Sequence, residues 1–289
     1  MTTAAQWLEG ARPRTLPAAF APVLVGTGAA AQVDSVRPGR AVLALIVALA
    51  LQVGVNYAND YSDGIRGTDD ERVGPLRLVG GGHASAAAVL RAALLALGIA
   101  ALVGLVLAAL TSWWVLLVGV AALAAAWGYT GGDRPYGYRG FGEISVFVFF
   151  GLVAVLGTTF VQAERLTWPA LGGGIACGAL ACAILVTNNL RDIPTDTLAG
   201  KRTLAVVLGE RRSRLLYPSL IGAALLVPIA LAPAVPTALL ALLAAPLAIE
   251  PVGKVRAGVA GRDLVAVLAA TGMLQLAYGG LLALGLALG

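Results

Sequence analysis

The fold of this chain is decided by the stretch Asn56-Tyr57-Ala58-Asn59-Asp60-Tyr61-Ser62-Asp63-Gly64-Ile65-Arg66-Gly67-Thr68-Asp69-Asp70-Glu71-Arg72. It follows directly on a long apolar run over residues 41–55. A helix that continues past Asn59 places Asn59 and Asp63, four residues apart, on one face. Gly64 and Gly67 then end the helix, which lets Asp69 fold back towards that face. The stretch therefore predicts a group of carboxylates at the end of a hydrophobic span.

Such a group of acids needs a partner of opposite charge, because neighbouring carboxylates repel each other. Mg²⁺ is typically held in proteins by a few carboxylates together with substrate phosphates. Polar groups at membrane depth are expensive to bury and usually have a function. We therefore interpret the stretch as a site for Mg²⁺, with a solvated acidic loop as the alternative.

The composition indicates a polytopic membrane protein. Of its 289 residues, 59% are hydrophobic and 12% are charged, and the mean hydropathy is +0.86. A soluble domain has about 25% charged residues. The net charge of +5 comes from basic residues in short loops between apolar spans, so membrane topology explains it better than a nucleic-acid partner. Cys177 and Cys182 lie within one apolar run, which favours small buried side chains over a disulfide or a metal site.

With about 17 to 25 residues for each span, the apolar runs predict an all-α bundle of about nine transmembrane helices. The expected spans are residues 16–32, 41–58, 87–110, 113–129, 142–162, 170–188, 215–231, 235–249 and 264–288. Glu143 opens the fifth span, where interaction with the helix dipole accounts for an acid.

The distribution of basic residues predicts the orientation in the membrane. Lysine and arginine gather in the N-terminal segment and in the loops after the second, fourth, sixth and eighth spans, whereas the other loops carry Arg37, Arg40 and Arg165. Cytoplasmic loops are the basic ones. We expect a multi-pass protein of the cytoplasmic membrane with its N-terminus in the cytoplasm and its C-terminus outside.

A second stretch resembles the first: Asn188-Asn189-Leu190-Arg191-Asp192-Ile193-Pro194-Thr195-Asp196-Thr197-Leu198-Ala199-Gly200-Lys201-Arg202-Thr203. Both contain Asn-x-x-x-Asp, and both follow an even-numbered span. We interpret residues 1–289 as one domain with a weak internal repeat, whose motifs lie at 56–72 and 188–203. Membrane proteins built from repeats place their sites at the repeat interface. The two acidic stretches are therefore expected to face each other across a central cavity that opens to the cytoplasm.

Carboxylates mixed with lysine and arginine suit a complex of Mg²⁺ with a diphosphate, because the acids hold the metal and the cations hold phosphate oxygens. The apolar spans behind them provide a groove for a long isoprenoid tail. Departure of diphosphate becomes easier where its developing charge is already neutralised. The chain has no Gly-x-x-x-x-Gly-Lys-Ser/Thr motif, which argues against nucleotide hydrolysis. The pattern thus favours ionisation of an allylic diphosphate and capture of the carbocation by an electron-rich acceptor.

The two motifs resemble the UbiA superfamily of intramembrane aromatic prenyltransferases. The resemblance covers nearly the whole chain and is closest to the branch that prenylates 1,4-dihydroxy-2-naphthoate in menaquinone synthesis. Its blocks are Arg12-Pro-Arg-Thr-Leu-Pro, the stretch from Asn59 to Asp69, Arg72-Val-Gly-Pro-x-Arg77-Leu-Val, Gly142-Glu-x-x-Val-Phe-x-Phe-Phe-Gly151, Asn188-Asn-Leu-Arg-Asp, and Gly200-Lys-Arg-Thr-Leu-Ala.

The resemblance implies Mg²⁺-dependent transfer of a polyprenyl group from its diphosphate to 1,4-dihydroxy-2-naphthoate, with loss of CO₂ and diphosphate, to give demethylmenaquinone. The metal ligands that it implies are Asn59, Asp63, Asp69, Asn188, Asp192 and Asp196. The diphosphate contacts are Arg72, Arg134, Arg191 and Lys201, and the acceptor contacts are Arg12, Tyr61 and Tyr129. The catalytic set is Asp60, Asp63, Asp192 and Lys201, with Asp60 as a further ligand or as a base for the naphthol hydroxyl.

Several alternatives stay open. Asp63 and Asp69 are six residues apart where many members of the superfamily space the acids by four, which leaves either Asp69 or Asp70 to complete the metal shell. Arg12 also suits a simple positive-inside anchor, and Tyr61 and Tyr129 also suit ordinary interfacial positions. The acceptor can be another aromatic ring. A transporter of an anionic solute is the alternative from another class of protein.

Overall fold

The structure is a computed structural model that describes residues 2–67 and 76–289, and within these ranges it is helical with connecting turns and no strand. The all-α prediction is therefore confirmed for the described residues. The helices are α1 (Ala4–Gly10), η1 (Pro13–Thr15), α2 (Pro17–Ala31), α3 (Pro38–Ile65), α4 (Ala86–Leu110), α5 (Trp114–Gly128), η2 (Tyr136–Arg139), α6 (Gly142–Val146), η3 (Phe147–Val153), α7 (Ala154–Ala163), α8 (Trp168–Leu198), α9 (Leu204–Leu231), η4 (Pro236–Ala248), α10 (Ile249–Arg256), η5 (Gly261–Asp263) and α11 (Leu264–Ala287).

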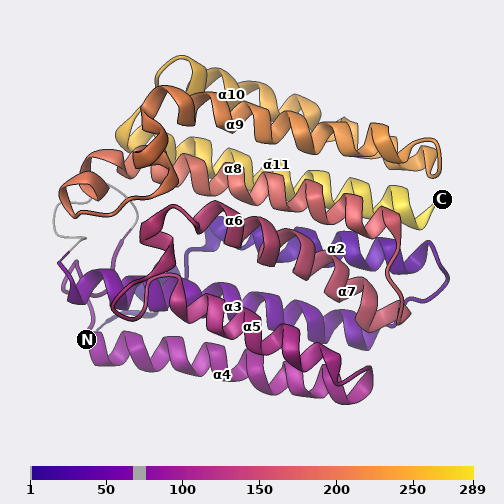
Figure 1. Cartoon of the computed structure of the whole chain (residues 1–289), viewed down its shortest axis with the longest axis horizontal. Coiled ribbons are helices and arrows are strands. Elements are labelled where there is room, and N and C mark those ends of the chain that lie inside the picture. Colours follow the sequence, from indigo (N-terminus) through magenta and orange to yellow (C-terminus); the bar gives the residue numbers. More distant parts are fainter. Residues whose placement is uncertain (1, 68–75) are drawn as a thin grey trace.

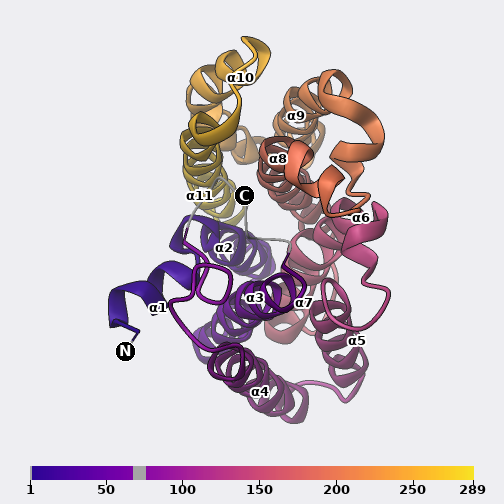
Figure 2. The same ribbon diagram turned by 90° about the vertical axis from the view of Figure 1, so that its left-hand side faces the viewer.

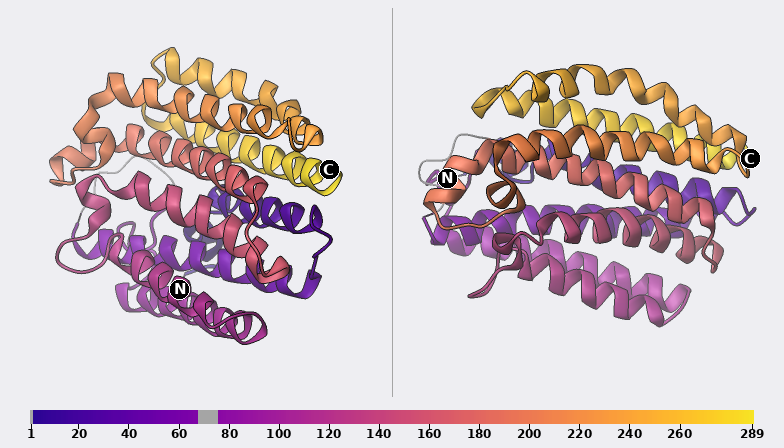
Figure 3. Two further views of the ribbon diagram at one scale, coloured as in Figure 1. Left: turned by 45° about the vertical axis from the view of Figure 1, so that its right-hand side comes forward. Right: turned by 45° about the horizontal axis from the view of Figure 1, so that its top comes forward.

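The long helices run side by side along the longest axis of the molecule, and the loops gather at its two ends (Figure 1). The N-terminus lies at one end and the C-terminus at the other. The end view in Figure 2 shows α2 and α3 near the middle, with α8, α9 and α11 to one side and α4 and α5 to the other. The same arrangement is seen from two oblique directions in Figure 3.

Seven helices of the described chain are long and apolar enough to cross a membrane, and α2 and α5 are shorter apolar helices. Each span expected from the sequence coincides with one of these helices. The number of crossings stays a prediction, because α2 and α5 have 15 residues each, fewer than the usual span of about 20.

The ends of three helices differ from the prediction. α3 continues to Ile65 rather than ending at residue 58, and α8 continues to Leu198 rather than 188. Hydropathy marks the end of the apolar segment, but the backbone hydrogen bonds of a helix continue into polar sequence. α9 begins at Leu204, ahead of the expected residue 215, and is interrupted at Gly209, whose φ is +75°. Only glycine adopts such a conformation readily.

α8 is the most buried of the long spans in the described chain. In its most apolar window 78% of the residues are buried, against 28% to 50% in the other long spans. Gly151 of η3 allows the closest approach to α8, because a Cβ atom there would lie 2.5 Å from the carbonyl oxygen of Gly174. Small residues at such contacts are typical of packing between membrane helices. Cys177 and Cys182 of α8 are buried and free, as the sequence predicts.

Candidate active site

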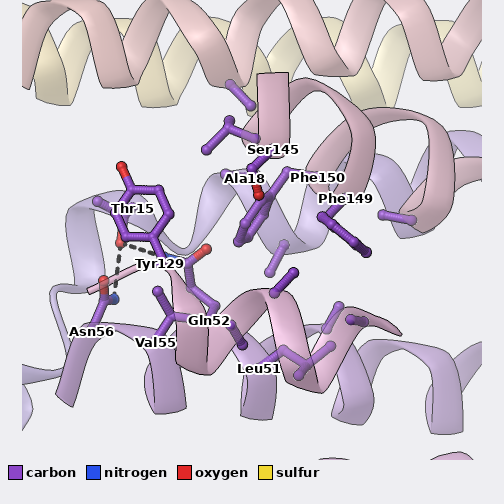
Figure 4. A pocket seen from close by; sticks show the side chains of 18 of the residues that line it. Thr15, Ala18, Leu51, Gln52, Val55, Asn56, Tyr129, Ser145, Phe149 and Phe150 are labelled. Carbon is purple, nitrogen blue, oxygen red and sulfur yellow. Dashed lines mark hydrogen bonds between the residues drawn. The ribbon is translucent and has the colours of Figure 1, made fainter. Parts of the chain in front are cut away.

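A cavity of about 1170 Å³ lies between α2, α3, α5, α8 and the continuous helix formed by α6, η3 and α7. Its walls are apolar along most of the helices, and its polar residues come largely from the ends of α3 and α8 nearest the N-terminus (Figure 1). Figure 4 shows part of this cavity, with Phe149 and Phe150 on one side and Gln52 and Asn56 on another. Residues of both acidic stretches line it: Asn59, Asp63, Asn188, Arg191, Asp192, Asp196 and Lys201.

The first stretch contributes Asn59 and Asp63 from the last turns of α3, which continues past the apolar span expected at 41–58 and so places both residues on one helical face. Asp63 is buried, and its carboxylate accepts hydrogen bonds from three directions. Lys201 Nζ lies 2.9 Å from Oδ1, and an Arg77 guanidinium nitrogen lies 3.4 Å from Oδ2. The hydroxyl of Tyr138 also donates to Oδ1. Asp63 thus joins the end of α3 to residues that follow α5 and α8.

The second stretch places its polar side chains along one face of α8. Arg191 Nε donates to Asp192 Oδ1 at 2.7 Å, and a second guanidinium nitrogen donates to Asp192 Oδ2 at 2.8 Å. The same nitrogen donates to Asn188 Oδ1 at 2.6 Å. Asp196 accepts a hydrogen bond of 3.4 Å from the hydroxyl of Thr203. Arg191 therefore holds the amide and the first acid of this motif in place.

Each stretch thus brings an acid to the cavity, Asp63 from the first and Asp192 from the second, and each acid is paired with cations. The pairing crosses between the stretches, because Lys201 of the second one neutralises Asp63 of the first. The sequence predicted that facing acids need a cation between them, and in this structure lysine and arginine side chains supply it. Among the described residues no group of three or more His, Cys, Asp or Glu side chains lies close enough to hold a metal ion. Asp69, Asp70 and Arg72 lie outside the described residues, so the metal shell stays a prediction.

Tyr138 and Arg77 are site residues that were absent from the predicted set. Lys201 Nζ lies 4.7 Å from the centre of the Tyr138 ring, within range of a cation–π interaction. Burial, together with the charge of Asp63, raises the pKa of Tyr138, which keeps its hydroxyl protonated as a donor. The sequence before it, Gly131-Gly132-Asp133-Arg134-Pro135-Tyr136-Gly137, indicates a turn, and the residue predicted there as a site contact was Arg134 rather than Tyr138. Arg77 lies in a basic segment near the first motif, and the position of that segment is the sequence feature that could have identified it as a site residue.

Asp60 is placed away from the cavity, so the structure does not bring it to the predicted catalytic set. Its two carboxylate oxygens accept hydrogen bonds from the backbone N–H groups of Leu78 and Val79, at 2.8 and 2.9 Å. Asp60 is 1% exposed and does not line the cavity. The helical period explains this placement. Residues 59 and 63 share one face of α3, and residue 60 is rotated from residue 59 by about 100° around the helix axis. Asp60 instead ties the segment at 78–79 to α3.

Of the other residues predicted to contact the diphosphate or the acceptor, some line the cavity and others do not. Arg12 and Tyr129 line the cavity, whereas Arg134 is exposed and outside it. Tyr61 packs beside a small apolar cluster that includes Tyr57 and Leu78. Tyr129 meets the ring of Tyr136 edge to face, with 5.6 Å between ring centres, which fixes its orientation at the cavity wall.

Further polar side chains that the sequence did not single out line the cavity beyond the acids. Gln52 and Asn56 of α3 both donate to the hydroxyl oxygen of Thr15, at 3.1 and 3.3 Å (Figure 4). Asn189 of α8 donates to Glu143 at 3.0 Å. Gln52 and Asn56 continue the face of Asn59 and Asp63 along α3 at helical spacing, a periodicity that could have identified them.

Comparison with known proteins assigns the family. The model of the UbiA prenyltransferase family matches residues 19–263. The chain is 56% identical over 278 residues to a 1,4-dihydroxy-2-naphthoate octaprenyltransferase of Mycobacterium tuberculosis, which covers 96% of this chain and 95% of the relative. It is 51% identical, with the same coverage, to the Mycobacterium leprae protein of that name.

The fold also matches a solved structure, a UbiA homolog from Archaeoglobus fulgidus bound to DMAPP and Mg²⁺. The TM-score is 0.63 at 16% sequence identity, over 96% of this chain and 99% of that one. At this identity the match shows the fold alone. None of these similarities supports the transporter alternative. The extent of the family match and the identity to its members show that this chain belongs to the UbiA prenyltransferase family and is an enzyme that transfers prenyl groups.

Proposed function

We propose that this enzyme transfers a polyprenyl group from its diphosphate to 1,4-dihydroxy-2-naphthoate. The observation that carries the proposal is the meeting of two acid–cation motifs, from α3 and from α8, at the polar end of one apolar cavity. An allylic diphosphate has a charged head and a long apolar tail, and this cavity has a matching polar end and apolar walls. The names of the two mycobacterial relatives supply the acceptor.

The reaction balances without a protein base. The allylic C–O bond breaks, and its electron pair leaves with the diphosphate. The ring carbon that bears the carboxylate forms the new C–C bond. The carboxylate then leaves as CO₂, and its bonding pair restores the aromatic ring. The product of this step is the hydroquinone form of demethylmenaquinone, and its later oxidation to the quinone by an external two-electron oxidant is separate from the transfer. Because no proton has to be removed, the placement of Asp60 outside the cavity is compatible with this chemistry.

The donor set at the polar end of the cavity fits Mg²⁺. Carboxylate and amide oxygens are the ligands that this hard cation prefers, and such oxygens line the cavity on both motifs: Asn59, Asp63, Asn188, Asp192 and Asp196. The metal would neutralise charge on the departing diphosphate. Asp69 is proposed as a further ligand from the sequence motif, with Asp70 as its alternative.

The protein's own cations have a second task in this proposal. Lys201 and Arg191 are held by carboxylates of the two motifs. Both side chains line the cavity, so a diphosphate entering it takes over their hydrogen bonds. Charge-assisted bonds of this kind are stronger than neutral ones. Arg12 and Tyr129 lie on the same cavity and are proposed as acceptor contacts, whereas Tyr61 and Arg134 lie outside it.

The acceptor is tested with purified protein, geranyl diphosphate and a panel of aromatic acids. We expect transfer to 1,4-dihydroxy-2-naphthoate with release of CO₂, detected by mass spectrometry of the product. 4-Hydroxybenzoate and homogentisate should give no product, and EDTA should abolish transfer until Mg²⁺ is restored. Preference for another acceptor would overturn the acceptor assignment, and turnover in EDTA would overturn the role of the metal.

A further inference from the structure

A buried acid–amide pair, Glu143 with Asn189, borders the cavity and has no part in the chemistry described above. Glu143 is 7% exposed at the start of α6, and its Oε1 accepts the hydrogen bond from Asn189 Nδ2 at 3.0 Å. Its Oε2 is buried without a hydrogen bond among the described residues. An acid interacts favourably with the helix dipole without being buried. Burial of a carboxylate whose oxygen lacks a hydrogen bond costs free energy. Glu143 lies in the first turn of α6, as the helix-dipole interpretation expects, but that interpretation does not explain why the side chain is buried and paired with Asn189.

The pair fixes which end of the Asn189 amide faces the cavity. Asn189 Nδ2 donates to Glu143 Oε1, so the amide turns its NH₂ group towards Glu143 and its carbonyl oxygen away from it. Asn189 lines the cavity, and its Oδ1 makes no hydrogen bond within the part of the chain that the structure describes. The side chain thus presents a carbonyl oxygen to whatever occupies the cavity.

The same arrangement recurs on α3. Asn56 donates its NH₂ group to the Ala11 carbonyl at 2.9 Å and to Thr15, and Gln52 donates its own to Thr15. Figure 4 shows both amides beside Tyr129 at the cavity. In each case the NH₂ end is held by the protein, and the carbonyl end is left for a ligand. Carbonyl oxygens accept only, so the organic group that matches them by hydrogen bonding carries hydroxyl or N–H donors.

We propose that Glu143 is a positioning residue that orients Asn189, and that Asn189 Oδ1 accepts a hydrogen bond from a ring hydroxyl of the aromatic acceptor. The inference rests on the proposed function, because that acceptor carries two phenolic hydroxyl groups. A diphosphate or a carboxylate brings no such donor at neutral pH, so these amides distinguish the ring from the other charged groups that bind in the cavity.

The test compares acceptors that differ by one hydroxyl. The Michaelis constant for the dihydroxy acid is compared with the inhibition constants of its two analogues, 1-hydroxy-2-naphthoate and 4-hydroxy-2-naphthoate. Wild-type protein should bind the analogue that lacks the hydroxyl recognised by Asn189 about 10-fold more weakly than it binds the dihydroxy acid. In Asn189→Leu and Glu143→Leu this ratio should fall to near one. These constants do not depend on the fraction of protein that is folded.

Two comparisons isolate the positioning role. If Glu143 acts through Asn189, the double variant Glu143→Leu/Asn189→Leu should show the ratio of Asn189→Leu alone. Glu143→Gln should keep part of the discrimination, because its side-chain oxygen still accepts, and it serves where Glu143→Leu fails to fold. Gln275→Leu is the matched control, since Gln275 is a buried amide on α11 that donates to Cys177 and lies outside the cavity. Its ratio should equal that of wild type.

Unchanged ratios for both analogues in Asn189→Leu would overturn the inference while leaving the proposed function intact. Ratios that fall further in the double variant than in Asn189→Leu would overturn the positioning role of Glu143. A wild-type protein that fails to prenylate 1,4-dihydroxy-2-naphthoate would overturn the proposed function and this inference with it.

Discussion

At the scale of single residues, two neighbouring aspartates on α3 have different surroundings. Asp63 faces the cavity and meets Lys201, Arg77 and Tyr138. Asp60, three residues earlier, binds two backbone N–H groups outside the cavity. Their burial is similar, at 5% and 1% exposure, so it cannot separate their roles. Their hydrogen-bond partners do separate the two roles. Asp63 contacts long cationic side chains that can turn towards a ligand, whereas Asp60 contacts backbone N–H groups that are fixed in place.

Asp60→Asn should lower stability, and Asp63→Asn should lower turnover. An asparagine at position 60 turns an NH₂ group towards one of the two backbone N–H donors, which costs about 1–3 kcal/mol. The melting temperature should fall, while kcat for the remaining folded protein changes little. Asp63→Asn should lose Mg²⁺-dependent transfer in the protein that remains folded, and its melting temperature should also fall because Lys201 and Arg77 lose the carboxylate that pairs with them. The opposite assignment of the two effects would contradict this division.

Lys201→Met should weaken binding of the prenyl diphosphate. The substitution keeps an unbranched side chain that is one atom shorter, and it removes the charge that pairs with Asp63. Loss of a charge-assisted hydrogen bond predicts that kcat/KM for the diphosphate falls by about 10- to 100-fold. The inhibition constant of inorganic pyrophosphate should rise in parallel. Lys254→Met is the control, because Lys254 forms an exposed pair with Glu250 on α10 and should behave as wild type.

At the scale of the helices, the contact between η3 and α8 is the tightest constraint on the cavity wall. A Cβ atom at Gly151 would lie 2.5 Å from both Gly174 O and Gly178 Cα, which are backbone atoms that cannot rotate away. The helix that carries Phe149 and Phe150 into the cavity is thereby held against the most buried span of the bundle.

Gly151→Ala should therefore push this helix away from α8. We expect a lower melting temperature and reduced turnover, since Phe149 and Phe150 move with the backbone. Gly98→Ala on α4 is the matched control, because a Cβ atom there meets nothing within 4 Å. That control should be neutral or slightly stabilising, as alanine is the better helix former. Equal effects of the two substitutions would show that the contact with α8 does not matter.

The sequence predicts the positions of the helices better than it predicts the residues at which they end or the side-chain contacts between them. Hydropathy places every span, but it ends α3 and α8 early because their last turns are polar. The motifs predict that Asn59, Asp63, Asp192 and Lys201 share a site, since periodicity and spacing are local properties. Tyr138 and the pairing of Glu143 with Asn189 depend on how loops and helices pack in three dimensions. No local pattern carries that information.

At the scale of the whole molecule, the two ends of the bundle differ in character. The end with the N-terminus holds both motifs. The loops at the opposite end include the exposed pairs of Arg37 and Arg40 with Glu164. These arginines lower the pKa of Glu164, so this contact is present at neutral pH and is lost in acid, as pH falls through the depressed pKa. Exposed pairs of this kind contribute little to stability.

The predicted orientation can be read from cysteine labelling. Cys177 and Cys182 are buried, so the native thiols should not react with an impermeant maleimide. Ala257→Cys is on the end that holds the motifs, and Leu288→Cys is near the C-terminus; both positions are exposed. In intact cells stripped of their outer layers, we expect labelling at position 288 and none at 257 until the membrane is opened. The reverse pattern would place the site outside the cytoplasm.

The crossed pairing of Lys201 with Asp63 has a consequence for how the proposed enzyme is loaded. Because Asp63 and Asp192 are already paired with lysine and arginine side chains, they offer a lone divalent ion little gain in free energy on binding. The lysine and arginine release their carboxylates when an anion arrives to take them, so metal and activated lipid are expected to enter together. Under these conditions the supply of isoprenoid, rather than the cell's store of magnesium, sets the fraction of enzyme at work.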